Sequence, residues 1–185
     1  MNEPILFTER LILRRPAAED LNGWAAFSAD PVATEHLGGP VERSVAWRQL
    51  CTMAGSWEIA GFAMFSVIER ATGKWVGRLG PWQPEGWPGT EVGWGVSSEF
   101  AGKGYAYEGA VAAMDYAVDI LGWSEVIHTI APENTRSIRL AQRLGSTNLR
   151  AAKLPAPYAD VAVDAWGQTA DQWRAGRQNR DVAAR

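Results

Sequence analysis

The sequence predicts a mixed α/β domain, and three observations lead to that prediction. The 185 residues are the length of a single domain, and 46% apolar with 21% charged residues is typical of a folded protein with a buried core. Residues 90–130 have the pattern strand, long helix, strand, which predicts a βαβ unit with two parallel strands. Residues 61–82 have the pattern of an antiparallel hairpin that turns at Thr72-Gly73. The sheet is therefore expected to contain both kinds of strand pairing.

The first half of the chain predicts two helices between strands. The expected elements are a strand over 10–16 closed by Pro16, a helix over 17–27, a second helix over 41–57, and hairpin strands over 61–69 and 74–82. The stretch between the two helices, 28–40, is rich in turn residues and is expected to be a loop. Ten tryptophans are unusual for this length, and they indicate either a substrate pocket or core and oligomer contacts.

The second half predicts the rest of the sheet. The expected elements are a strand over 90–96, a glycine-bearing loop over 97–103, a helix over 104–121, a strand over 125–130, a helix over 135–144, and strands near 147–150 and 161–166. Residues 6–173 are interpreted as one domain. The tail, 174–185, holds four arginines against Asp181, so it carries +3 of the net charge of −3 and leaves −6 on the rest. We expect this basic tail to be disordered.

Composition and charge exclude several classes of protein. A net charge of −3 argues against a nucleic-acid binder, which needs a basic surface, whereas a mildly acidic body suits a cationic acceptor such as an amine. Cys51 is the single cysteine, and His36 and His128 are the only histidines, so neither a disulfide nor a metal site is expected. The longest apolar stretch, 59–68, is far shorter than the roughly 20 residues that span a bilayer, and the N-terminus has no export signal. We therefore expect a cytoplasmic protein without a membrane partner.

The loop 101–106 is the first candidate for chemistry. It lies between a predicted strand and a predicted helix, where the first helical N–H groups have no acceptor within the helix. These donors and the positive end of the helix dipole form a site for phosphate oxygens, and Gly102 and Gly104 let the backbone approach a ligand. The spacing matches neither a Walker loop nor a dinucleotide fingerprint. A purely structural turn is the alternative.

The strand before that loop carries two interior glycines. Val92, Trp94 and Val96 are expected on one face of the strand, with Glu91, Gly93 and Gly95 on the other. Glycine inside a strand weakens it and often marks a site where a ligand or another backbone comes close. Packing against a bulky neighbour is the alternative.

Several motifs together resemble a known family. They are Thr8-Glu9-Arg10-Leu11-Ile12-Leu13-Arg14, Glu91-Val92-Gly93-Trp94, Gly102-Lys103-Gly104-Tyr105-Ala106-Tyr107-Glu108 and Asn134-Thr135-Arg136-Ser137, in that order. The chain resembles the GNAT superfamily of acetyl-coenzyme-A-dependent N-acetyltransferases over about residues 6 to 150, and within it the branch with the ribosomal-protein-alanine N-acetyltransferases. The resemblance implies a mostly antiparallel central sheet with one splayed parallel strand pair and flanking helices.

The resemblance also implies where acetyl-CoA binds. The backbone amides of Gly102, Lys103, Gly104, Tyr105 and Ala106 would hold the pyrophosphate, and the pantetheine arm would pair with Trp94, Gly95 and Val96 like an added strand. Asn134 and Ser137 match the branch's Asn-x-x-Ser signature, which contacts the cofactor. Gly104 and Ala106 match the family's phosphate-loop pattern, whereas Ala101 stands where the family usually has Gln or Arg.

The implied reaction is direct attack of an amine on acetyl-CoA in a ternary complex, without an acyl-enzyme. Glu91 is the candidate base, directly or through water, and a surface ion pair with Arg or Lys is the alternative. Relatives often place a tyrosine acid seven residues after the asparagine, but that position is Ala141, so Ser137 is the next candidate acid. Ser137 can equally be a helix-capping residue, and Tyr105 and Tyr107 are alternatives as the acid.

The remaining candidates are assigned more ordinary roles. Cys51 is interpreted as a small buried hydrophobic residue rather than a nucleophile, and His128 as a hydrogen-bonded histidine of the sheet rather than a base. The resemblance places Glu35, His36, Trp47 and the segment 82–87 toward the acceptor side.

The sequence therefore predicts an enzyme that transfers acetyl from acetyl-CoA to a primary amine, either a protein N-terminus or a small-molecule amine, without a metal. Two alternatives remain: a domain that binds acetyl-CoA without turnover, and an interaction protein that has lost the cofactor. The tryptophan count and the habits of the family allow a homodimer.

Overall fold

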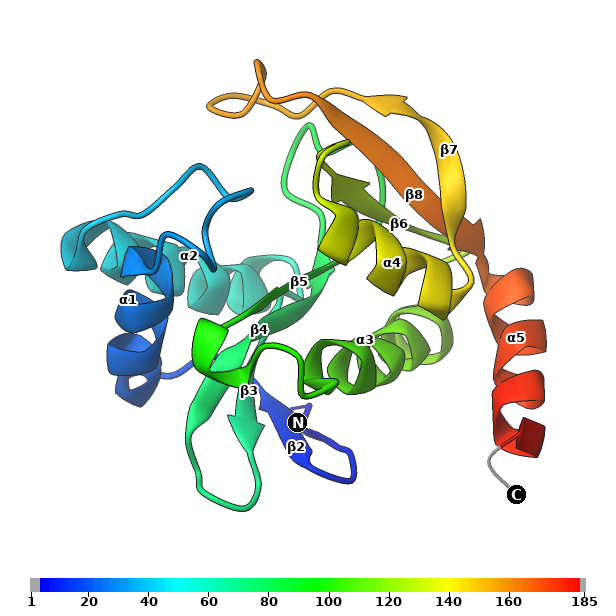
Figure 1. Cartoon of the computed structure of the whole chain (residues 1–185), viewed down its shortest axis with the longest axis horizontal. Helices are drawn as coiled ribbons and strands as arrows, with labels where there is room; N and C mark the ends of the chain where they lie inside the picture. The colour runs from blue at the N-terminus through cyan, green and yellow to red at the C-terminus, as the bar shows by residue number, and fades with distance from the viewer. Residues whose placement is uncertain (1–3, 184–185) are drawn as a thin grey trace. The chain divides into compact units, whose positions relative to one another are not determined.

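The computed structural model describes residues 4–183, which form one mixed sheet with flanking helices (Figure 1). The strands are β1 (Leu6–Phe7), β2 (Leu11–Arg14), β3 (Phe65–Glu69), β4 (Trp75–Trp82), β5 (Glu91–Val96), β6 (Glu125–Ile130), β7 (Thr147–Ala152) and β8 (Val163–Thr169). The α-helices are α1 (Leu21–Ala29), α2 (Arg43–Ile59), α3 (Tyr105–Asp115), α4 (Thr135–Leu144) and α5 (Ala170–Ala183). Three short turns of other helix types are η1 (Ala18–Asp20), η2 (Ser98–Phe100) and the π-helical η3 (Tyr116–Ile120).

The strand order is β1-β2-β3-β4-β5-β6-β8-β7. β5 and β6 are parallel, with Glu91 opposite Ile127, while β1–β2, β2–β3, β3–β4, β6–β8 and β7–β8 are antiparallel. The predicted βαβ unit is therefore confirmed: a strand, α3 and a parallel strand follow one another as the sequence pattern indicates. The predicted combination of a mostly antiparallel sheet with one parallel pair is confirmed as well.

The chain divides into two compact units, and β5 passes from one to the other. Unit 1 comprises Met1–Trp82 and Gly93–Ala113, and unit 2 comprises Gln83–Val92 and Met114–Arg185. The interpretation of residues 6–173 as a single domain stays a prediction.

Unit 1 is built on the antiparallel strands β1 to β4. Leu11, Leu13 and Leu79 are completely buried on these strands, since alternate residues of a strand face the same side. Helix α1 packs against α2 and against β4 (Figure 1). The contact is close at Gly23, where a Cβ atom would lie 2.6 Å from Trp75 Cβ. Only glycine allows the helix to approach the strand at this point.

Unit 2 contains the antiparallel strands β6, β8 and β7, with α4 and α5 (Figure 1). Its core includes Ile127, Leu144 and Trp173, all completely buried. Helix α4 ends at Gly145, whose φ of 93° lies in the left-handed region that favours glycine. The stop signal predicted for this helix is confirmed.

Two predicted elements differ from the structure. The helix expected over 104–121 changes at Tyr116 into a π-turn, in which the Leu121 N–H donates to the Tyr116 carbonyl at 3.0 Å, five residues back. The strand expected from residue 61 begins only at Phe65.

The expectation of a disordered tail from residue 174 is wrong for residues 174–183, which continue α5. The cause is a set of contacts within unit 2. The Trp173 indole donates to Asp115 Oδ1 at 2.9 Å, and Arg177 Nη1 lies 2.8 Å from Asp115 Oδ1 and 2.6 Å from Asp119 Oδ2. Arg174 adds a weaker ion pair with Asp119 at 3.4 Å. Arg174 and Arg177, which suggested a solvated tail, instead bind acidic residues around η3. Residues 184 and 185 of the predicted tail lie outside the described residues.

Candidate active site

The predicted phosphate loop lies in unit 1, between η2 and α3. Gly102 has a φ of 77° and Gly104 a φ of 81°, both in the left-handed region where other residues are strained. Residues 101–104 are exposed, and Lys103 Nζ lies 4.8 Å above the centre of the Phe100 ring. The loop is therefore an exposed turn whose shape depends on both glycines.

The start of α3 has no side-chain cap from the residue before it. The Gly104 carbonyl accepts the Glu108 N–H at 3.1 Å, which places Gly104 at the position that would normally cap the helix. Glycine has no side chain that could accept the backbone N–H groups of the first helical turn. Such donors at a helix N-terminus suit an anionic ligand.

The strand segment 94–96 also lies in unit 1. Trp94 and Val96 are half-buried, whereas Gly95 is buried. A Cβ at Gly95 would lie 2.8 Å from Phe27 Cζ, and a Cβ at Gly77 would lie 2.2 Å from the Gly95 carbonyl oxygen. Close packing of β5 against β4 and α1 is thus enough to require glycine at position 95, as the packing alternative stated.

The Asn134–Ser137 pair lies in unit 2, at the start of α4. Asn134 is the N-cap, and its Oδ1 accepts the Ser137 backbone N–H at 3.1 Å. Both residues are half-buried. The signature residues therefore first serve the helix itself, because the asparagine oxygen satisfies one of the helix's own donors.

Glu91 is the first residue of β5 and belongs to unit 2. Its side chain is buried, with 6% of the residue exposed. The carboxylate accepts the Thr129 hydroxyl at 2.9 Å, the Thr129 backbone N–H at 3.3 Å and the Trp87 indole N–H. The alternative of a surface ion pair is wrong, because the carboxylate lies inside the unit and is held there by neutral donors.

His128 is a hydrogen-bonded histidine of the sheet, as predicted. It is 1% exposed, with Nδ1 2.7 Å from the Val92 carbonyl and Nε2 3.1 Å from Ser146 Oγ. Burial lowers the pKa of His128 to about 4, although the bond to the Val92 carbonyl opposes the shift. The ring is therefore neutral at pH 7.

The other positions considered for the proton-donating acid are Ala141, where relatives often have a tyrosine, and the hydroxyls of Tyr105 and Tyr107. Ala141 is completely buried on α4 and offers no acid. The Tyr105 hydroxyl donates to Glu69 Oε1, a bond that raises the pKa of Tyr105. Tyr107 is half-buried.

Of the residues assigned toward the acceptor side, Glu35, His36, Trp47 and Trp82 lie in unit 1, whereas 83–87 lie in unit 2. Glu35 and His36 are neighbours, with Oε2 and Nε2 3.8 Å apart, and Trp47 is 47% exposed on α2. Cys51 is exposed, so its predicted burial is wrong. The buried residues of α2 are Ala46, Leu50, Met53 and Trp57, and Cys51 falls outside this stripe.

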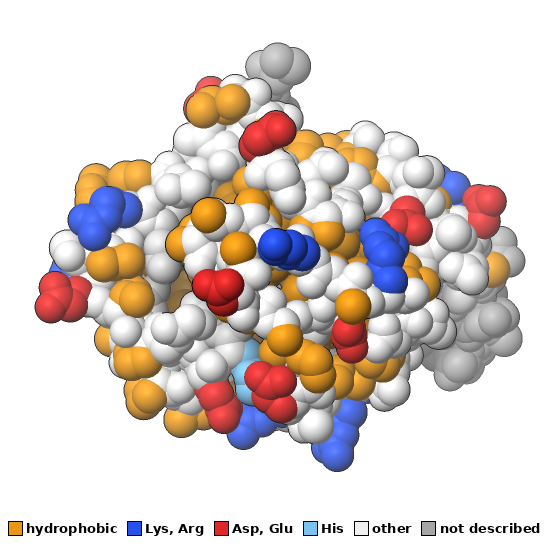
Figure 2. Space-filling view, turned by 90° about the horizontal axis from the view of Figure 1, so that it is seen from above, with side chains coloured by type: hydrophobic (Ala, Val, Ile, Leu, Met, Phe, Trp, Pro, Cys, Tyr) orange, Lys and Arg blue, Asp and Glu red, His pale blue; other side chains and the backbone are white. Residues whose placement is uncertain are grey.

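Exposed hydrophobic side chains gather in both units. In unit 1 they include Val32 and Leu37 in the segment between α1 and α2, and in unit 2 Leu149, Tyr158 and Val161 around the β7–β8 connection. Figure 2 shows hydrophobic surface among acidic and basic side chains on the face it presents. Such surface suits contact with an acceptor or a partner.

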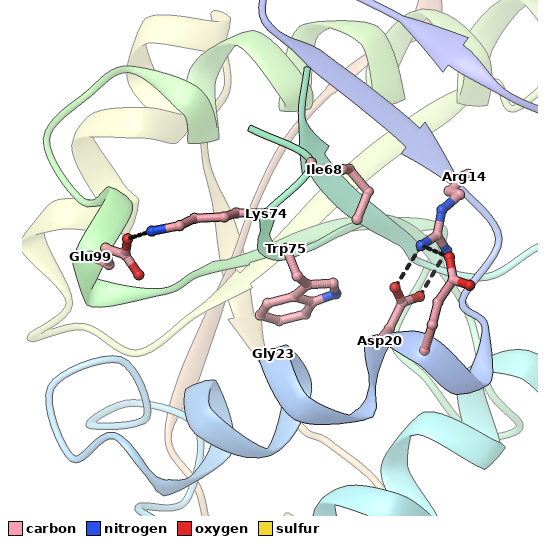
Figure 3. Close-up of a pocket in the computed structure, with 9 residues that line it drawn as sticks. Arg14, Asp20, Gly23, Ile68, Lys74, Trp75 and Glu99 are labelled. Carbon is pink, nitrogen blue, oxygen red and sulfur yellow. Dashed lines mark hydrogen bonds and ion pairs between the residues drawn. The ribbon is translucent and has the colours of Figure 1, made fainter. Parts of the chain in front are cut away.

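An open cavity of about 450 Å³ lies in unit 1 (Figure 3). Its lining residues are Arg14, Glu19, Asp20, Gly23, Ile68, Gly73, Lys74, Trp75 and Glu99. Arg14 pairs with the buried Asp20 at 2.7 Å, and Lys74 pairs with Glu99 at 2.7 Å across the rim. Both cations of this cavity are thus already paired with its carboxylates, and none of the predicted site residues lines it.

Two residues without a predicted role lie at the phosphate loop: Arg10, whose side chain contacts the loop, and Glu108, which binds Arg10. Arg10 Nη1 donates to the Lys103 carbonyl at 2.9 Å, and Arg10 Nε donates to Glu108 Oε2 at 2.7 Å. Both residues occur in the motifs that carry the family resemblance, and those motifs were the sequence signal that could have pointed to them. Their contact could not be predicted because they are 98 residues apart.

Within the described residues, no group of three or more His, Cys, Asp or Glu side chains is arranged to hold a metal ion. Over the same part of the chain, none of the helices has the length and apolar character needed to cross a membrane.

Comparison with known proteins agrees with this geometry. A family model described as an acetyltransferase (GNAT) domain matches residues 10–147. An uncharacterized N-acetyltransferase, p20, from Bacillus licheniformis is 30% identical over 142 residues, which cover 75% of this chain and 80% of that protein. The crystal structure of an acetyltransferase from Agrobacterium tumefaciens has a TM-score of 0.78 and 30% identity, covering 91% of this chain and 95% of that one.

Two more distant structures share the fold. The ribosomal-protein alanine acetyltransferase from Vibrio fischeri has a TM-score of 0.69 at 17% identity, covering 92% of this chain and 99% of that one. The spermidine N-acetyltransferase from Vibrio cholerae, solved with CoA and spermine, has a TM-score of 0.72 at 16% identity, covering 90% and 99%. The family model and the relatives at 30% identity place the chain among the acyltransferases. The chain belongs to the GNAT family of acetyltransferases.

Proposed function

We propose that this acetyltransferase takes acetyl from acetyl-CoA and transfers it to a primary amine. The exposed loop with two left-handed glycines before an uncapped α3 carries the proposal, because its backbone donors fit a pyrophosphate. The residues that would hold the pyrophosphate are Gly102 to Ala106, and Trp94 to Val96 would pair with the pantetheine arm. The complex of a structural neighbour with CoA supports this assignment.

The proposed chemistry is direct attack on the thioester. The neutral amine nitrogen attacks the acetyl carbonyl carbon, the carbon–sulfur bond breaks, and CoA leaves as a thiolate that takes up a proton. Glu91 would accept the proton lost by the amine, directly or through water. Ser137 would lie near the leaving thiolate as the proton donor, since Ala141 has no hydroxyl.

The acceptor class proposed is a cationic amine, either a protein N-terminus or a small-molecule amine such as a polyamine. The net charge of −6 on residues 1–173 favours an acceptor that is protonated in solution. One neighbour acts on spermidine and another on ribosomal-protein alanine, so both acceptor types are represented in this fold.

The first experiment is isothermal titration of acetyl-CoA into the protein, followed by an assay of CoA thiol release with peptides and polyamines. We expect saturable binding of about micromolar strength and thiol release that depends on an amine. Absence of binding at millimolar acetyl-CoA would contradict the donor assignment.

Binding of acetyl-CoA without turnover is a second candidate function. The observation that favours it is Ala141, which is buried and cannot supply the usual acid. Binding without thiol release for any amine tested would support this second function over the first.

A further inference from the structure

A pair of charged side chains holds the phosphate loop from outside. Arg10, between β1 and β2, contacts Glu108 in the first turn of α3 twice: its backbone N–H donates to Oε1 at 2.7 Å, and its Nε donates to Oε2 at 2.7 Å. Thr8 Oγ1 also donates to Glu108 Oε1, at 2.6 Å. The N-terminal segment is thereby bound to the start of α3 through one carboxylate, entirely within unit 1.

The guanidinium of Arg10 continues along the loop itself. Its Nη1 donates to the Lys103 carbonyl at 2.9 Å, and its Nη2 would lie 3.4 Å from a Cβ placed on Gly104. The guanidinium carbon lies 4.6 Å from the centre of the Tyr105 ring. Arg10 therefore contacts Lys103 and Tyr105 and lies beside Gly104 between them.

The bond to the Lys103 carbonyl fixes the direction of a neighbouring donor. A trans peptide is planar, so the carbonyl of Lys103 and the N–H of Gly104 point in opposite directions from the same peptide unit. With the carbonyl turned toward Arg10, the Gly104 N–H is turned away from it. Gly104 is one of the residues proposed to hold the pyrophosphate.

The pair is ionised at neutral pH. Burial alone raises the pKa of Glu108, but hydrogen bonds from Thr8 and from the backbone and side chain of Arg10 outweigh it, so this pKa is lowered overall. The hydrogen bond to Glu108 raises the pKa of Arg10. The Glu108 side chain is 15% exposed and that of Arg10 is 43% exposed, so the bond is partly shielded from solvent.

We infer that Arg10 and Glu108 are positioning residues for the acetyl donor: they fix the orientation of the loop peptides that receive the pyrophosphate. This inference rests on the proposed function. The alternative, direct contact of the Arg10 charge with phosphate, makes a different prediction, because it needs the cation but does not need Glu108.

The test compares two donors. S-acetylpantetheine carries the thioester and the pantetheine arm but lacks the nucleotide and the pyrophosphate. For Arg10→Ala, we expect KM for acetyl-CoA to rise about tenfold at nearly unchanged kcat, with no change in KM for S-acetylpantetheine. An equal loss with both donors would show a general structural defect and overturn the inference.

Two further variants separate positioning from direct charge contact. Arg10→Lys keeps the cation but lacks the planar fork that reaches Glu108 and the Lys103 carbonyl together, so it should resemble Arg10→Ala. Glu108→Gln keeps Arg10 but weakens its anchor, and it should also raise KM for acetyl-CoA alone. Normal kinetics for both variants would overturn the inference. If Arg10→Ala does not fold, Glu108→Gln still carries the test.

Arg43→Ala is the matched control, because Arg43 lies on the exposed start of α2 and donates to the Asn22 side chain at 2.8 Å. Failure of the proposed function and failure of this inference give different results. If the unmodified protein does not bind acetyl-CoA, the donor assignment falls and this inference with it. If it binds and Gly104→Glu abolishes binding while Arg10→Ala leaves it intact, the inference alone is wrong.

Discussion

Two helices in this protein begin next to predicted donor-binding residues, and they begin differently. Helix α4 in unit 2 starts at Asn134, whose side chain accepts the N–H of Ser137. Helix α3 in unit 1 starts after Gly104, which has no side chain to offer. In α4 the Asn134 side chain accepts one of the helix's own N–H groups. In α3 the cap residue has no side chain, so the helix start suits an anionic ligand as the acceptor. From this contrast we expect anion binding in unit 1 and a different contribution from unit 2.

The largest effect is expected when a side chain blocks the start of α3. Gly104→Glu places a bulky negative side chain among the donors and forces a strained φ, so acetyl-CoA affinity should fall at least about a hundredfold. Titration calorimetry measures it. Gly61→Glu is the control, because Gly61 has a similar φ of 79° in the same unit with nothing within 4 Å of its Cβ position. Equal binding by both variants would remove the loop from the donor site.

The next measurement asks whether unit 2 supplies chemistry rather than binding. Glu91→Gln should lower turnover about a hundredfold, mainly at low pH where free amine is scarce, and should leave acetyl-CoA affinity unchanged. A pH profile of kcat together with calorimetry checks both parts. Thr129→Val is a related variant, because it removes the hydroxyl that donates to Glu91 while keeping the carboxylate. Normal turnover of Glu91→Gln at every pH would clear Glu91 of the role of base.

A third measurement concerns the pH dependence of stability near the C-terminal end of α4. Ser146, just after α4, bonds to the buried His128. The pKa of His128 is lowered to about 4 in the folded protein, from an ordinary 6.5. Its stabilising contribution is complete above pH 6.5 and is lost as the pH falls toward 4, because only the unfolded chain then takes up the proton. Unfolding free energy should fall by about 2 kcal/mol between pH 7 and pH 5.

Urea unfolding at the two pH values measures this effect, and His128→Gln serves as the reference. The variant has no imidazole to titrate, so its stability should change less over the same interval. If both proteins lose stability equally, His128 is not the group that links α4 to pH.

The smallest effect tests whether the cap at α4 is only a cap. Asn134→Ala should lower unfolding free energy by about 1 kcal/mol, because the Ser137 N–H loses its acceptor. Asn134→Ser keeps an accepting oxygen and should recover most of this loss. A rise in KM for acetyl-CoA in both variants would show that Asn134 also contacts the donor, and an unchanged KM would leave it a structural residue.

Local patterns predicted the elements and the loop, but not the partners of individual side chains. The hairpin, the βαβ unit and the stop at Gly145 depend on residues close in sequence, and all three were predicted. Burial of Cys51 was predicted wrongly, because the buried stripe of α2 depends on helix phase.

Contacts between distant segments decided the other differences. The tail is helical because Arg177 meets Asp115, 62 residues earlier. The place of Glu91 depends on Thr129, 38 residues later. No periodicity or local motif shows such a pairing. The resemblance identified residues of the donor loop, yet it did not show that Arg10 holds that loop.

The position of Arg10 has a practical consequence for how the protein is handled. Thr8 and Arg10 bond to Glu108 at the start of α3, so an affinity tag inserted directly before Thr8 would lie beside the support of the predicted donor loop. Removal of such a tag should precede any kinetic comparison of acetyl donors. A label attached to α5 would instead lie near Arg177, which binds Asp115 and Asp119, and there it would test the stability of unit 2.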